Sequence, residues 1–147
     1  MEQTNEEQLP RNPTEAQGLL IKAVYKQFGA ESLPLIRDVL GKQGQALGGK
    51  IKKKLPDNSL STVATAFCKS FDPSKINIIT ISDEKFQIQG GSCPFGLENT
   101  SRELCEAVMN IDFEYFKTAV SDRIKMKIPQ TIAAGDSICE TVYEFKK

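Results

Sequence analysis

The sequence predicts an α+β domain in which N-terminal helices pack on an antiparallel sheet built from two hairpins. Helical patterns fill the first half of the chain, and two pairs of alternating segments follow, each pair joined by a turn or loop. The 147 residues are enough for one domain, and no internal repeat or low-complexity linker divides them. We therefore expect a disordered arm over 1–13, polar and proline-containing, and a single domain over 14–147.

Three helices are expected before residue 74. The first begins with Thr14 as its N-cap and ends at Gly29. The second follows Ser32, and the third has Asp57 or Ser59 as its cap. Four glycines over 41–49 weaken the second helix by about 1 kcal/mol each relative to alanine. They could let another helix or a ligand approach closely. The lysines that follow could bind an anion, but a solvated helix end explains them too.

The remaining elements alternate between strand pairs and helices. Residues 76–82 are rich in β-branched side chains, and they form a hairpin with 85–91. Thr100 and Glu103 have the spacing of a capping box, and the helix that they begin breaks at 110–112. A short helix over 113–120 leads to a second hairpin, which turns at Gly135-Asp136.

Composition excludes several classes of function. The 19 basic and 19 acidic residues cancel, so the chain lacks the basic surplus typical of nucleic-acid binding. No apolar run reaches the roughly 18 residues that span a bilayer, and the polar N-terminus does not resemble a signal peptide. We expect a cytoplasmic protein that binds neither membrane nor nucleic acid. Because histidine is absent, a catalytic triad, a histidine-ligated zinc and a histidine-ligated haem are excluded within this chain.

Four separated cysteines are the residues most suggestive of chemistry. They are Cys68, Cys93, Cys105 and Cys139. Without an export signal, thiolate chemistry or metal binding is a sharper interpretation than disulfides. The alternative is that they are buried free thiols, because the spacing lacks the signature of a zinc finger.

The second half of the chain resembles two related families. The run GGSCPFG, a helix carrying ELC, and TIAAGDSIC before an alternating strand are similar to the 4-vinyl reductase domain family. They also resemble the L-2-amino-thiazoline-4-carboxylic acid hydrolase family. Both families resemble the fold shared by TRAPP vesicle-tethering subunits and haem-based nitric oxide sensors. The specific part covers roughly residues 75–145.

The resemblance implies a metal site. Cys93, Cys105 and Cys139 match cysteines that are associated with zinc in 4-vinyl reductase-like sensors, and Cys68 lies outside that pattern. Three thiolates leave one position of a tetrahedral zinc site for another ligand. The candidates for it are Cys68, Asp112, Asp136, Glu140 and water. Four cysteines also allow an iron–sulfur cluster.

Two functions remain open at this stage. The first is a sensor-like binding module for a small apolar or heterocyclic ligand, braced by the metal and forming a homodimer through the N-terminal helices. Six phenylalanines could line its cavity or simply pack in the core: Phe67, Phe71, Phe86, Phe95, Phe113 and Phe116. The second, implied by the hydrolase resemblance, is an enzyme that opens a cyclic C–N bond. Cys93 would be its nucleophile and Asp136 its general base, although Asp136 also suits a plain turn.

Overall fold

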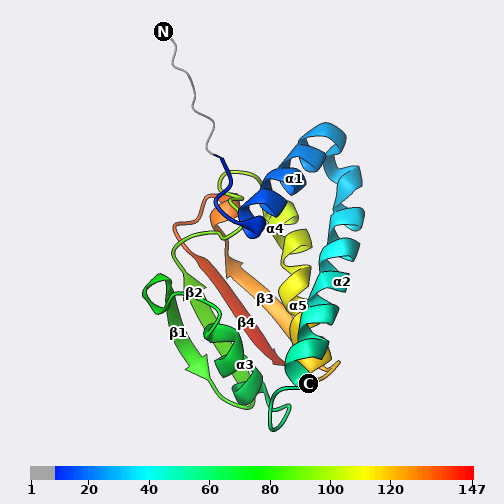
Figure 1. The fold of residues 1–147 in the computed structure, drawn as a ribbon. Coiled ribbons are helices and arrows are strands. Elements are labelled where there is room, and N and C mark those ends of the chain that lie inside the picture. The colour runs from blue at the N-terminus through cyan, green and yellow to red at the C-terminus, as the bar shows by residue number, and fades with distance from the viewer. Residues whose placement is uncertain (1–8) are drawn as a thin grey trace.

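The computed structural model describes residues 9–147 and consists of helices on a small sheet (Figure 1). Residues 1–8 of the expected N-terminal arm lie outside the described residues. The first helix already begins at Pro13, the last residue of the expected arm. Within the described part of the chain, no helix is long and apolar enough to cross a membrane. The helices are α1 (Pro13–Phe28), α2 (Leu33–Lys52), α3 (Leu60–Cys68), α4 (Arg102–Val108) and α5 (Asn110–Ala119); the strands are β1 (Ile76–Ile81), β2 (Lys85–Gly90), β3 (Ile124–Gln130) and β4 (Cys139–Phe145).

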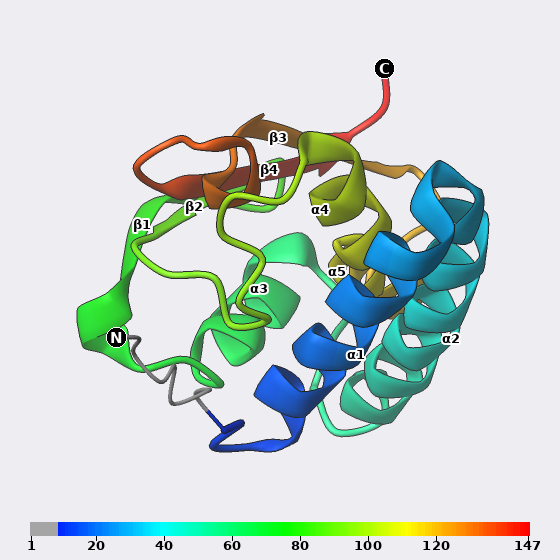
Figure 2. The same ribbon diagram turned by 90° about the horizontal axis from the view of Figure 1, so that it is seen from above.

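The four strands form one antiparallel sheet in the order β1-β2-β4-β3. The hairpins β1–β2 and β3–β4 are joined side by side through β2 and β4, with Phe86 opposite Tyr143. In Figure 2 the sheet forms one layer and the helices lie on one side of it. The α+β class and the two hairpins predicted from the sequence are therefore confirmed.

The two faces of β4 differ in chemistry, as its alternation predicts. Tyr143 and Thr141 point to the helix side, where they are buried. Glu140 points to the opposite face, where its carboxylate accepts hydrogen bonds from Gln87, Gln89 and Gln130. These hydrogen bonds hold the pKa of Glu140 below its ordinary value. The outer face of the sheet is therefore polar, and ligand-binding chemistry must be sought on the inner face.

The glycines of α2 allow this helix to pack closely against α5. The helix continues through them to Lys52, with Gly41, Gly44 and Gly48 buried. A β-carbon on Gly48 would lie 2.5 Å from the carbonyl oxygen of Tyr115. The expectation that these residues admit another helix is confirmed, and tertiary packing outweighs their low helix propensity.

Several element ends differ from the sequence prediction by one to three residues. Asn12, not Thr14, caps α1 by accepting a hydrogen bond from the N–H of Glu15. Ser101, not Thr100, caps α4 through the N–H of Leu104. The expected break at 110–112 falls at Met109, so that Asn110 already belongs to α5. In each case a neighbouring polar side chain satisfies the same free backbone groups, which periodicity alone cannot distinguish.

The buried side chains form two hydrophobic clusters rather than one. The sheet-side cluster contains Leu60, Phe86, Phe116 and Tyr143 and lies between the sheet, α3 and α5. The helix-side cluster contains Ile36, Leu40, Leu104 and Val108 and joins α1, α2 and α4. This division leaves room for a cleft between the two clusters.

Candidate functional site

A large cleft lies between the sheet-side and helix-side clusters. Its volume is about 1820 Å³, and its walls come from α1, the C-terminal part of α2, the end of α3, the 70–76 segment, the 91–98 loop, α4, α5 and β4. Phe67 and Tyr143 line it from the sheet-side cluster, and Val108 and Leu97 line it from the helix-side cluster. A concave, largely apolar site between packed layers is the usual location of a small-molecule ligand.

The expected phenylalanines divide between this cleft and the core. Phe67, Phe71 and Phe95 line the cleft. Phe86 and Phe116 are fully buried in the sheet-side cluster, where their rings pack with centroids 5.7 Å apart. The ring of Phe113 lies outside the cleft lining and contacts the ammonium of Lys117.

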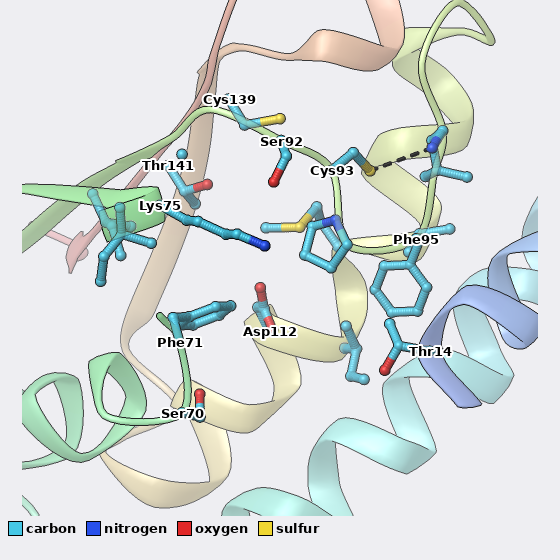
Figure 3. A pocket seen from close by; sticks show the side chains of 18 of the residues that line it. Thr14, Ser70, Phe71, Lys75, Ser92, Cys93, Phe95, Asp112, Cys139 and Thr141 are labelled. Carbon is cyan, nitrogen blue, oxygen red and sulfur yellow. Dashed lines mark hydrogen bonds between the residues drawn. The ribbon is translucent and has the colours of Figure 1, made fainter. Parts of the chain in front are cut away.

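The loop over 91–98 closes one end of the cleft and is held closely against α1. A β-carbon on Gly18 of α1 would lie 1.8 Å from the carbonyl oxygen of Phe95. Within the loop, the Leu97 N–H donates to the Sγ of Cys93 over 3.4 Å, which Figure 3 shows as a dashed line. The loop therefore places the Cys93 thiol in the cleft wall at a defined position.

Three of the four cysteines gather at this end of the cleft. Cys93, Cys105 and Cys139 all line it. A negative charge on the thiolate of Cys93 or Cys139 would raise the pKa of Cys105, which shows that the three side chains are close to one another. The Ile132 N–H donates to the Sγ of Cys139 over 3.4 Å, and Thr131 hydrogen-bonds both Cys105 and Cys139. The three cysteines singled out by the family resemblance are thus neighbours in space.

Burial keeps two of these thiols protonated at neutral pH. Desolvation raises the pKa of Cys105 to about 11. It also raises the pKa of Cys139, whose sulfur is half-buried. A thiol is a weak nucleophile until it ionises, so neither side chain is prepared for attack. Cys93 is half-buried and faces the cleft.

The remaining residues of the expected metal site lie elsewhere. Cys68 is buried at the end of α3, in the sheet-side cluster. Glu140 is on the outer face of the sheet. In residues 9–147, no three Cys, Asp or Glu side chains are placed to hold a metal ion together. The described residues therefore give the zinc and iron–sulfur expectations no support, and these stay predictions.

Asp136 shapes a turn before β4. Its carboxylate accepts a hydrogen bond from the Thr131 N–H over 2.9 Å, and Gly135 beside it has a φ of 100°. Asp136 does not belong to the cleft lining, whereas Cys93 does. The structure thus places the two residues of the expected hydrolase site in different surroundings.

Asp112 is the acidic group on α5 that faces the cleft. Figure 3 shows its carboxylate across the cavity from Lys75, with Thr141 on the sheet side. Desolvation raises the pKa of Asp112 to about 7. The side chain is only partly buried by area, because it opens onto the cleft. A carboxyl group in such a position is typical of binding sites.

The polar groups of the cleft were not predicted from the sequence. Asp112 was expected only among the possible metal ligands, and no role was expected for Lys75 or Thr141. The sole signal for Asp112 was an acidic residue among apolar and aromatic neighbours on a helix. Its position in a cleft depends on how α5 meets the sheet, which no local pattern encodes.

Comparison with solved structures supports the expected fold type. The chain resembles the crystal structure of a trafficking protein particle complex subunit 3 from Naegleria fowleri, covalently bound to palmitic acid. The TM-score is 0.59 at 14% sequence identity, over 91% of this chain and 95% of that one. This similarity shows a TRAPP-like fold, as expected. Neither a protein-family model nor a curated protein matches the sequence.

Proposed function

We propose that this protein is a binding module for a small, mainly apolar ligand that occupies the cleft between its two hydrophobic clusters. The observation that carries the proposal is the cleft itself, about 1820 Å³ in volume and lined by aromatic and aliphatic side chains from both clusters. Such a volume exceeds the roughly 300–1,000 Å³ of typical ligand pockets. It leaves room for a molecule with a long or bulky apolar part.

The structural neighbour supports an acyl-sized ligand. That protein, which has a similar fold, was crystallised with covalently bound palmitic acid. In this chain, Phe67, Phe71 and Tyr115 supply apolar wall area suited to a hydrocarbon chain. Cys93, whose thiol faces the cleft, belongs to the same lining.

The binding test uses an uncharged fluorescent apolar probe, Nile red, and a variant that fills the cleft. Ala66 of α3 lines the cleft, so Ala66→Trp should lower probe affinity by about tenfold or more through lost space. Ala46→Trp is the control, because Ala46 is exposed on α2 outside the lining. Equal affinity of the two variants, with both folded by circular dichroism, would refute binding in this cleft.

The hydrolase interpretation stays a prediction with a direct test. It requires Cys93 to attack a cyclic C–N bond and Asp136 to act as a base. Hydrolysis of L-2-amino-thiazoline-4-carboxylate by the wild type, lost in Cys93→Ala, would support it. Full activity in Cys93→Ala would remove this mechanism.

We also propose that the chain associates with a second copy through α1 and α2. Leu20 and Phe28 of α1 and Leu35 of α2 are 60–65% exposed, more than a helix hairpin needs for its own packing. Val39 extends the apolar surface, as do Leu19 and Leu47, which also line the cleft. The structural neighbour is itself a subunit of a complex.

A further inference from the structure

Four polar side chains face the cleft from two opposed elements. Thr141 and Tyr143 lie two residues apart on β4 and therefore share its inner face. Asp112 and Tyr115 lie three apart on α5 and share one helix face. All four line the cleft. Asp112 acts electrostatically on both Tyr115 and Tyr143, which places its carboxyl group close to the two phenols.

These groups reach the open space of the cleft. Tyr143 is only 1% exposed and Thr141 only 7%, and both line the cleft. Among residues 9–147, no buried side-chain nitrogen or oxygen lacks a hydrogen-bond partner, so none of these oxygens is a buried unpaired group. Polar atoms at the wall of a cleft are available to a ligand.

A role for Asp112 in the helix alone does not explain this arrangement. It lies in the first turn of α5, where a carboxylate could cap free backbone N–H groups. However, α4 runs almost directly into α5 through Met109, and no side-chain cap is formed there by the described residues. The carboxylate points into the cleft instead (Figure 3).

We propose that the ligand of the cleft carries an amine head on its apolar body, and that the ammonium group pairs with Asp112 beside the hydroxyls of Tyr143 and Thr141. This inference rests on the proposed function and specifies its ligand class. An ammonium offers N–H donors to a carboxylate and to hydroxyl oxygens, and it neutralises the buried charge. A carboxylate head would meet Asp112 as a like charge, and a pure hydrocarbon would leave Asp112 unpaired.

Lys75 also affects which head group of a ligand the cleft can bind. It reaches into the cleft from the segment before β1 (Figure 3), and it forms no ion pair with any other residue in the described chain. A cationic head at Asp112 therefore faces a like charge across the cavity. Removing that charge by Lys75→Gln should strengthen binding of an amine and weaken binding of a carboxylate.

The test compares three ligands with the same chain, dodecylamine, dodecanol and dodecanoate, each displacing the uncharged apolar dye Nile red. Dodecylamine should bind roughly tenfold or more tightly than dodecanol, as expected for a charged hydrogen bond. Asp112→Asn should abolish that preference while leaving dodecanol within about threefold. Tyr143→Phe, which removes only the hydroxyl, should weaken the amine several-fold. Asp122→Asn is the matched control, because Asp122 is exposed outside the cleft.

The outcomes separate the two proposals. If none of the three ligands displaces the probe, both the cleft function and its ligand class are wrong. If all three displace it but dodecylamine has no advantage, or keeps its advantage in Asp112→Asn, the amine inference alone is overturned. If dodecanoate binds most tightly of the three, the amine inference is likewise overturned, and the carboxylate head group of the ligand would pair with Lys75 instead.

Discussion

A β-carbon added to Gly44 of α2 would lie 2.0 Å from the carbonyl oxygen of Ile111 on α5. This contact is tighter than any side chain allows, and its partner is backbone, which cannot move aside as a side chain can. The packing of α2 on α5 thus depends on the absence of a side chain at this position. Because α5 also presents Asp112 to the cleft, this packing positions the site as well.

Gly44→Ala should destabilise the protein by about 1–3 kcal/mol, because overpacking outweighs the gain of roughly 1 kcal/mol in helix propensity. Gly49→Ala is the matched control on the same helix: nothing lies within 4 Å of its added β-carbon. It should be neutral or stabilise by up to about 1 kcal/mol. Urea unfolding of both variants measures the difference. Equal stabilities would contradict the packing argument.

The fold follows largely from local patterns in the sequence. The 76–91 hairpin and β4 were predictable because β-branched and alternating residues are bounded by turn residues. For the glycines of α2, the sequence predicted close approach of either another helix or a ligand, and it did not decide between the two. The pairing of β2 with β4 joins segments about fifty residues apart, and no local pattern specifies it.

The stability of the protein should fall as pH rises from about 4 to 7, through the contribution of Asp112. The folded pKa is about 7 and the ordinary value is 3.8, so the folded state binds more protons within this interval. The loss is at most about 1.4 kcal/mol per pH unit and stops above the folded pKa. The phenols close to Asp112 are those of Tyr115 and Tyr143, and burial raises the pKa of both above the ordinary value of 10.0.

Asp112→Asn isolates this contribution from that of the other carboxyl groups. The variant should unfold at a higher urea concentration than the wild type at pH 8, and the two should converge near pH 4. Asp122→Asn should follow the wild type at every pH. A constant difference between Asp112→Asn and the wild type from pH 4 to 8 would show that Asp112 titrates normally.

The site could be predicted only in part. The resemblance singled out Cys93, Cys105 and Cys139, and all three line the cleft, but in residues 9–147 no three Cys, Asp or Glu side chains are placed to hold a metal ion together. Their gathering depends on the 91–98 loop meeting α4 and β4, which are distant in sequence. The position of Thr141 and Tyr143 at the wall of the cleft is a property of the folded chain and has no signature in the sequence.

The zinc prediction has a direct test in metal analysis of anaerobically purified protein. If zinc is bound by the three clustered thiols, about one zinc per chain should be found and lost in Cys93→Ser, Cys105→Ser and Cys139→Ser. Cys68→Ser should keep it, because Cys68 lies in the sheet-side cluster. Iron with acid-labile sulfide would favour the cluster alternative. Absence of both metals would remove the metal site and leave these thiols free.

If two copies of the chain associate through α1 and α2, charged substitutions on that surface should dissociate the dimer. Leu35→Glu with Val39→Glu places two charges one helical turn apart on the exposed surface of α2. This variant should sediment as a monomer at micromolar concentration where the wild type is a dimer. Ile79→Glu is the control, since Ile79 is similarly exposed on β1. A wild type that is strictly monomeric at these concentrations would end the dimer proposal.

Cys93 should react with iodoacetamide well before Cys68 or Cys105 at pH 8. Cys105 is buried with a pKa of about 11, so only about one molecule in a thousand carries its thiolate at that pH. Cys68 is buried and burial raises its pKa as well. Mass spectrometry of peptides after timed quenching gives the rate for each thiol. Faster labelling of Cys105 would show that the 91–98 loop does not cover the cleft as described.

The same reaction reports whether the cleft is occupied. Because Cys93 lines the cleft, a bound apolar ligand should slow its labelling. The labelling rate should fall by a factor of about the total protein concentration divided by the concentration of ligand-free protein. The Ala66→Trp variant should lose this protection along with its affinity, and Ala46→Trp should keep it. Protection of Cys93 that persists unchanged in Ala66→Trp would mean that the ligand reaches the thiol by a route other than the cleft.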